Sequence, residues 1–150
     1  RKEALEDAIS ATKAAVAEGI VPGGGVALLR TVPAVERLFA ECRGDVLTGA
    51  RILAASLATP ARQIAINSGF DGGVVVERLR ASTGAQGFDA ATGEYVDLLK
   101  AGILDPTKVV RIALENAVSV ASVLLLAEGT LVEVQKPAKE RAGLVEDEPA

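Results

Sequence analysis

The sequence predicts a mainly α-helical fold, and three observations support this class. The 150-residue chain is rich in alanine, valine and leucine, and only 3% of its residues are aromatic, a composition typical of closely packed helices. Apolar residues recur at helical spacing in most segments, and glycine or proline stands near many segment ends. Strand-like patterns are confined to a small β-hairpin and one late edge strand.

The first third of the chain predicts two helices joined by a glycine turn. Residues 4–18 carry apolar side chains at helical spacing, and Gly19 is a typical helix stop. Val21 precedes a proline and is therefore expected to be extended. Glycines occupy 23–25, and a short helix follows that Pro33 is expected to disturb or end.

The middle third predicts three further helices. Asp45 is expected to cap a helix over 46–58, whose inner stripe contains Val46, Ala50, Leu53, Ala54 and Leu57. Thr59 and Pro60 have the residue types of an N-cap and a first helical position. Residues 74–82 begin with three valines, which favour a strand, but the spacing of the apolar positions and the helical neighbours favour a helix.

The last third predicts a hairpin and a long helix. Glycines punctuate residues 84–93, and the hairpin tip is expected at 89–93, followed by a helical turn that ends near Gly102. Asp105 is expected to cap a helix that runs to Glu128 and is buried on all sides after Asn116, because that stretch has no charge. An edge strand follows, and the charged tail is expected to be disordered.

Composition excludes several function classes. The net charge is −4 and no basic stripe is present, so a nucleic-acid partner is not expected. The chain has no histidine, which excludes histidine triads and histidine metal ligands. Its single cysteine excludes an internal disulfide framework. The uncharged run over 116–127 is shorter than a bilayer needs, so no membrane partner is expected either.

Several candidate site residues have a structural reading beside a functional one. Glycines 23–25 before a helix are suited to an anion site, because backbone N–H groups there approach a ligand closely. The same glycines also fit a flexible helix connection. Asp105 reads as a helix cap, with an oxygen to spare for a ligand. Asp7 reads as one acid on a solvated helix turn, and Asp89 as a turn residue.

Three stretches together resemble the C-terminal part of group I chaperonins, the GroEL-like proteins. They are "EDAISATKAAVAEGIVPGGGVAL", "GFDAATGEYVDLLKAGILDPTKV" and the long helix ending in "AEG", and the resemblance covers about residues 1–136. It implies a piece of a longer protein, with an equatorial-domain-like helical bundle. Residues 1–18 would end the intermediate domain, 19–136 would form the second half of the equatorial ATP-binding domain, and 137–150 would be a disordered tail.

The resemblance also implies roles for individual residues. Gly24 matches a position whose backbone lies against the nucleotide, and the hairpin carries the adenine-contacting run Asp89, Ala90 and Ala91. Ile103 matches an apolar wall of the base site, and Asp105 matches the carboxylate that binds the ribose hydroxyls. Asp7 matches the aspartate that swings in from the intermediate domain and orients the attacking water during ATP hydrolysis.

The implied function is that of a cytoplasmic, ATP-driven protein-folding machine. The family uses ATP and ADP with Mg²⁺ and K⁺, and assembles as two stacked seven-membered rings that receive a co-chaperonin lid and enclose unfolded client proteins. No metal ligand is expected in this chain, because the family's phosphate loop and acidic metal ligands lie in the other half of the full protein. The chain alone is therefore expected to be inactive.

Two departures from the family pattern and two alternative functions remain. Asp89 stands where many members carry asparagine, and a carboxylate accepts but does not donate hydrogen bonds. The tail lacks the usual Gly/Met repeats. The alternative class is a non-enzymatic helical interaction module with the glycines as a hinge. A stand-alone phosphotransferase is disfavoured, because no Lys or Arg follows the glycines before Arg30.

Overall fold

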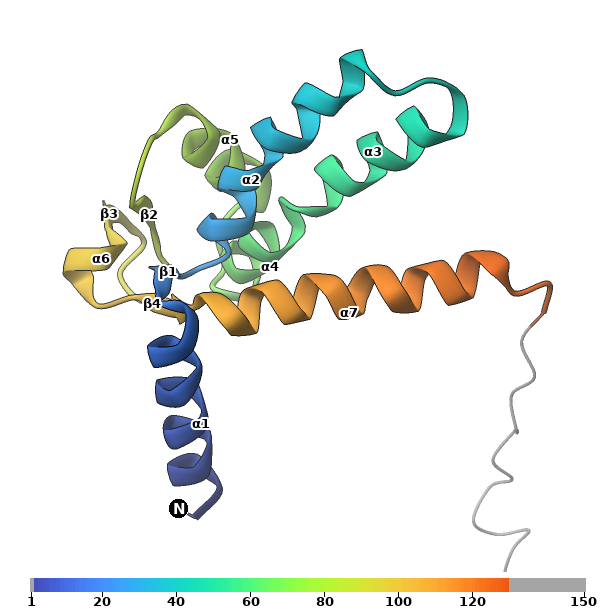
Figure 1. Ribbon diagram of the computed structural model, residues 1–150. Coiled ribbons are helices and arrows are strands. Elements are labelled where there is room, and N and C mark those ends of the chain that lie inside the picture. The colour runs from blue at the N-terminus through green and yellow to red at the C-terminus, as the bar shows by residue number, and fades with distance from the viewer. Residues whose placement is uncertain (1, 130–150) are drawn as a thin grey trace, which may run out of the picture. The chain divides into compact units, whose positions relative to one another are not determined.

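The structure is a computed structural model that describes residues 2–129, and it is mainly helical, as the sequence predicts (Figure 1). The chain divides into two compact units, 1–116 and 117–150. The predicted edge strand at 129–133 and the predicted disordered tail at 137–150 lie almost entirely outside the described residues. The elements are, in order, α1 (Lys2–Glu18), β1 (Ile20–Pro22), α2 (Val26–Arg37), a 3-10 turn η1 (Leu38–Ala40), α3 (Gly44–Ser56), α4 (Thr59–Asn67), α5 (Gly72–Ala81), β2 (Gln86–Asp89), β3 (Glu94–Asp97), α6 (Leu98–Ala101), β4 (Leu104–Pro106) and α7 (Thr107–Leu126).

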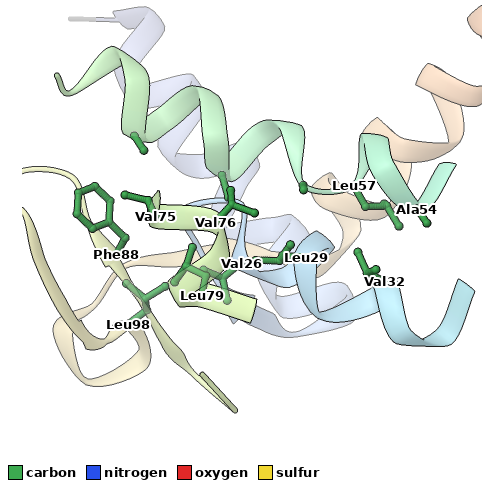
Figure 2. Packing of buried hydrophobic residues seen from close by; sticks show 13 residues of the cluster. Val26, Leu29, Val32, Ala54, Leu57, Val75, Val76, Leu79, Phe88 and Leu98 are labelled. Carbon is green, nitrogen blue, oxygen red and sulfur yellow. The ribbon is translucent and has the colours of Figure 1, made fainter. Parts of the chain in front are cut away.

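The core of the first unit joins α2, α3, α4, α5, the hairpin and α6 (Figure 2). Small side chains from α3 and α4 let these helices approach α2 and α5 closely, as the alanine-rich composition predicts. Each buried aliphatic side chain contributes about 1.5–3 kcal/mol to folding. The buried residues are Val26, Leu29, Val32, Ala54, Leu57, Ala58, Ala61, Ala65, Val75, Val76, Leu79, Phe88 and Leu98.

Two small antiparallel sheets complete the first unit. The predicted hairpin is confirmed, with β2 paired to β3 so that Phe88 lies opposite Tyr95. The second sheet pairs β1 with β4, in the register Val21 opposite Asp105. Val21 is extended, as expected, but the sequence analysis did not predict a partner 84 residues away.

The Asp105–Pro106 pair is a strand end and not a helix start, which corrects the prediction. Both residues belong to β4, and α7 begins one residue later at Thr107. The amide of Thr107 donates to the carbonyl oxygen of Gly19 at 3.1 Å, so this strand pairing extends to the first residue of the helix. The Asp105 carboxylate is thereby freed from a capping role.

Three smaller expectations about helix ends are also wrong. α2 continues through Pro33. Leu29 and Val32 before the proline and Val35 after it pack into the core, and this packing offsets the backbone hydrogen bond that proline cannot make. Asp45 lies in the first turn of α3 rather than at its cap. Thr59 is the first residue of α4, and Ala58 is its N-cap.

The α7 helix is exposed over its second half, contrary to the prediction that it is buried on all sides. No residue of the helix is fully buried, and Leu125 and Leu126 are 86% and 84% exposed. Absence of charge therefore predicts burial only when another surface covers the helix. The stripe of the α3 helix is similarly incomplete, with Val46 exposed and Ala54 and Leu57 buried.

The length and composition of α7 meet the criteria for a membrane-spanning helix. Its 18-residue window has a mean hydropathy of 1.8, and none of that window is buried. The sequence analysis considered only the uncharged run over 116–127, which is shorter than the 20-residue α7 helix. For this reason it did not identify α7 as long enough to span a membrane. Core helices of soluble proteins satisfy the same criteria, so length and composition do not assign α7 to a membrane.

Candidate functional site

The β1–β4 ladder brings the glycine loop next to the strand that carries Asp105. The loop continues this pairing by one bond, because the Gly23 amide donates to the Ile103 carbonyl oxygen at 3.0 Å. Gly23 is buried, and a Cβ atom at this position would lie 3.2 Å from that oxygen. The structure therefore brings Gly24, Ile103 and Asp105, three of the predicted site residues, into one neighbourhood.

The hairpin approaches the same loop from another side. A Cβ atom added at Gly24 would lie 3.6 Å from the carbonyl oxygen of Phe88, which directly precedes Asp89 in β2. At the hairpin tip, an Asp89 carboxylate oxygen accepts a hydrogen bond from the Ala91 amide at 2.9 Å. The Gly93 amide donates to the Asp89 carbonyl oxygen at 2.8 Å. The tip that contains Ala90 is thus a defined turn.

A cluster of three aromatic rings packs at the hairpin. Phe88 lies with its ring centre 5.0 Å from that of Phe70 in an edge-to-face arrangement, and 5.3 Å from that of Tyr95. The Arg78 guanidinium lies 3.9 Å from the Tyr95 ring centre. Such contacts contribute about 0.5–1.5 kcal/mol each beyond the buried area, so the hairpin is fixed to α5 as well as to the glycine loop.

The glycine loop offers unpaired backbone donors. Within the described residues, the amides of Gly24 and Gly25 have no hydrogen-bond acceptor, whereas those of Gly23 and Val26 are paired. Gly25 is the N-cap of α2, so the positive end of the helix dipole lies at the same place. Donors and dipole together form the type of site that binds phosphate or other anions.

The Asp105 carboxylate is partly buried and has no hydrogen-bond or ion-pair partner among the described residues. Burial raises its pKa above the usual aspartate range. A raised pKa means that the folded state binds the proton more tightly, so the ionised carboxylate costs stability above its folded-state pKa. Hydroxyl donors from a ligand would offset this cost, which is a physical reason to place a ligand here.

Asp7 lies away from these residues. It is exposed on α1, and it makes no side-chain hydrogen bond or ion pair with another described residue. Glu18 at the end of α1 lies eleven positions further along the helix, which corresponds to about 16 Å along the helix axis. The structure therefore does not bring Asp7 together with the other six predicted site residues, which are Gly24, Asp89, Ala90, Ala91, Ile103 and Asp105.

A fork of ion pairs joins the end of α1 to the start of α7. Arg111 donates to both carboxylate oxygens of Glu18, at 2.6 and 3.0 Å, and also to Glu115. The hydrogen bond from Arg111 holds the pKa of Glu18 below its usual range, and the two carboxylates raise the pKa of Arg111. This pair stabilises the fold above the ordinary glutamate pKa and is lost as the pH falls through the lowered pKa.

Arg111→Gln is therefore expected to return the pKa of Glu18 to the ordinary glutamate range, because the hydrogen bond and the charge disappear together. The pKa is measured by an NMR titration of the Glu18 carboxyl carbon. Arg51→Gln is the matched control, since Arg51 is an exposed arginine of α3 that makes no ion pair with another described residue. An unchanged Glu18 pKa in the Arg111 variant would contradict the pairing.

Among the described residues, no lysine or arginine makes a hydrogen bond or ion pair with the glycine loop, the hairpin tip at 89–93 or Asp105, which together we call the cradle. Arg30 is the first cation after the glycines, but its guanidinium is bonded to carbonyl oxygens of another loop. Among residues 2–129, no cluster of three histidine, cysteine, aspartate or glutamate residues is arranged to hold a metal ion. The described residues thus supply unpaired backbone donors and a carboxylate.

Sequence reasoning missed two features that build this site. The first is the β1–β4 ladder, whose only local signal is the extended dipeptide at Val21. The second is Arg30, whose isolation in an apolar helix face was the available signal. Both depend on segments at least 49 residues apart, which local patterns do not connect.

Comparison with known proteins gives consistent similarities. The TCP-1/cpn60 chaperonin family matches residues 1–135. A curated protein of Bradyrhizobium diazoefficiens named Chaperonin GroEL 5 is 64% identical over 141 residues, which is 94% of this chain and 26% of that protein. The chain thus spans about a quarter of the length of this curated relative.

Two solved structures share the fold. A group III chaperonin in the open state is 33% identical with a TM-score of 0.72, over 79% of this chain and 25% of that one. An open-state monomer of a group II chaperonin from Methanococcoides burtonii has a TM-score of 0.67 at 20% identity, over 72% of this chain and 28% of that one. The second similarity concerns the fold alone.

Proposed function

Because the chain belongs to the TCP-1/cpn60 chaperonin family, we propose that it supplies half of the nucleotide site, together with ring contacts, of an ATP-dependent chaperonin. Such a protein assists folding by enclosing non-native polypeptides in a ring cavity. The observation that supports the proposal is the β1–β4 pairing, which joins the strand that leads into the unpaired glycine amides to the strand that carries the partly buried Asp105.

Each part of the cradle is suited to one part of a purine nucleotide. The free amides of Gly24 and Gly25 would donate to phosphate oxygens at the positive end of α2. The Asp105 carboxylate would accept hydrogen bonds from the two ribose hydroxyls. The hairpin tip at Asp89, Ala90 and Ala91 would read the base edge, and Ile103 would pack against its face.

Hydrolysis of the terminal phosphate needs an oriented water molecule and concentrated positive charge. Asp7 would accept a hydrogen bond or a proton from that water once α1 approaches the cradle. Mg²⁺, with K⁺, would neutralise the phosphate charge, and its ligands are expected in the remaining three quarters of the protein. The chain by itself is therefore proposed to lack efficient ATPase activity.

The proposed partners follow from the family. We expect further copies of the same subunit in a double seven-membered ring, a co-chaperonin lid and unfolded client proteins, in the cytoplasm. The exposed apolar side chains of α7, such as Val123 and Leu124, favour burial against the rest of such an assembly. Nucleic acid and membranes are not expected as partners.

Asp105→Ala is expected to weaken ATP binding by about tenfold to a hundredfold, because two hydrogen bonds to a charged acceptor are lost. The dissociation constant is measured by titration calorimetry on the complete protein with magnesium present. Asp45→Ala is the matched control, because Asp45 lies in the first turn of α3 and makes no capping bond. Equal affinity of the Asp105 variant and the unmodified protein would overturn the proposed site.

The non-enzymatic alternative makes the opposite prediction. A helical interaction module with a glycine hinge would bind no nucleotide. The unmodified protein and the Asp105→Ala variant would then both show no ATP binding by calorimetry. Two structural observations disfavour a hinge at the glycines. Gly23 is buried and hydrogen-bonded to Ile103, and Gly25 lies in contact range of the α4 backbone.

A further inference from the structure

Arg30 connects α2 to the segment that joins α5 to the hairpin. Its guanidinium makes five hydrogen bonds, to the carbonyl oxygens of Leu79 (2.8 Å), Ser82 (2.6 Å), Gly84 (3.3 Å) and Gln86 (3.1 Å), and to the Ser82 hydroxyl oxygen (2.9 Å). A guanidinium has five N–H donors, so this set uses its full capacity. Because all five bonds go to residues 79–86, the Arg30 side chain holds α2 in a fixed position relative to this segment.

The bonded carbonyl groups explain why a cation is needed there. Leu79 and Ser82 lie at the end of α5, where helix carbonyl groups have no partner within the helix and the dipole is negative. Burial lowers the pKa of the Arg30 guanidinium, and the negative helix end favours its charged form. The Leu79 carbonyl oxygen also accepts hydrogen bonds from the Ser82 amide and hydroxyl, whereas the partly buried Ser82 carbonyl oxygen has Arg30 as its one donor among the described residues.

The attachment has consequences for the proposed cradle. Arg30 lies five residues after Gly25 on α2, the helix that begins directly after the free amides of Gly24 and Gly25. Its partner Gln86 is the first residue of β2, and the strand reaches the hairpin tip at Asp89. One side chain therefore ties the helix of the glycine loop to the strand that ends in the tip.

We propose that Arg30 is a positioning residue that sets the separation between the glycine loop and the hairpin tip, and so tunes the affinity of the cradle for an adenine nucleotide. This inference rests on the proposed nucleotide-binding function. Arg30 does not touch the nucleotide in this assignment. It acts through the α5–β2 segment, and a displacement of about 1 Å in a binding group is enough to change rate or affinity strongly.

The test compares Arg30→Gln and Arg30→Lys in the complete protein. Affinity for ADP is measured by calorimetry, and the KM and kcat for ATP are measured at a temperature where circular dichroism shows each variant folded. Hydrogen exchange without nucleotide reports on the amides of Gln86 and Leu98, which bond within this segment to Thr83 and Ala85. Arg80→Gln is the control, because the exposed Arg80 pairs only with Glu77 among the described residues.

Arg30→Gln is expected to weaken ADP binding and raise KM about tenfold, with kcat changed less than about twofold. Faster exchange at Gln86 and Leu98 is expected to accompany this change. Lysine keeps the charge but not the planar fork, so Arg30→Lys is expected to give a smaller change in the same direction. Should the glutamine variant not fold, the lysine variant decides by the same measurements.

Two outcomes would overturn the inference in different ways. If the unmodified protein binds ADP and the Arg30 variants bind it equally well, Arg30 has no positioning role while the proposed function stands. If the unmodified protein binds no adenine nucleotide, the proposed function fails and the positioning role fails with it. A fall in kcat at unchanged KM would also contradict the proposal, because it would place the effect on chemistry.

Discussion

Asp7→Ala protein is expected to bind ATP with unchanged affinity and to hydrolyse it about a hundredfold more slowly, the size expected for loss of a general base. Asp7 is exposed on α1 and contacts none of the residues that form the cradle, so its loss leaves ground-state binding intact. Binding is measured by calorimetry and turnover by phosphate release from the complete protein at saturating ATP.

The control for Asp7 is another acid on the same helix. Glu3 is exposed in the first turn of α1, and Glu3→Ala removes the same charge without the proposed role. We expect both binding and turnover to stay unchanged in that variant. Normal phosphate release by the Asp7→Ala protein would remove Asp7 from the mechanism, and weaker binding would give it a different role.

Gly25→Ala is expected to destabilise the fold by about 3 kcal/mol, the sum of a backbone and a packing cost. Gly25 has φ +74°, which costs an alanine about 1–2 kcal/mol. Its Cβ atom would also lie 2.5 Å from the Ala61 amide nitrogen and 2.9 Å from the Ala61 Cα. These are backbone atoms of α4 that do not rotate away, so overpacking adds about 1–3 kcal/mol.

The Gly25 effect is measured as a shift of the urea unfolding midpoint, followed by circular dichroism of the complete protein. Gly44→Ala is the matched control, because Gly44 has φ +56° and no atom lies within 4 Å of the added Cβ. This control isolates the backbone cost of about 1–2 kcal/mol. Equal shifts for the two variants would show that the approach of α2 to α4 does not require glycine.

The glycine run shows where sequence reasoning ends. Three consecutive glycines predict either an anion site or a flexible connection, and the sequence alone does not distinguish these two possibilities. The structure gives each position its own environment. Gly23 lies against Ile103, Gly25 lies against α4, and Gly24 has space beside the hairpin. Only the neighbours, which come from distant parts of the chain, separate these cases.

Asp105 shows the same limit from the opposite direction. An Asp-Pro pair before an apolar periodic stretch predicts a helix cap, because that is the commonest local solution. Pairing with β1 overrides this preference and places the residue in a strand. The predicted ligand role remains a proposal, while the predicted capping role is wrong. In α7, absence of charge indicated burial, but burial depends on a covering surface that the sequence pattern does not describe.

Local patterns in the sequence predicted the helical class, the positions of most helices and the hairpin, and three stretches carried the family resemblance. The helices and the hairpin depend on apolar spacing and on turn residues within a few positions, so they are encoded locally. Three features became visible only in the folded chain: β1 pairs with β4, a Cβ atom at Gly25 would meet the α4 backbone, and Arg30 bonds to the first residue of β2. Each of these depends on groups separated by more than 30 residues, whose contact is set by the packing of the whole core.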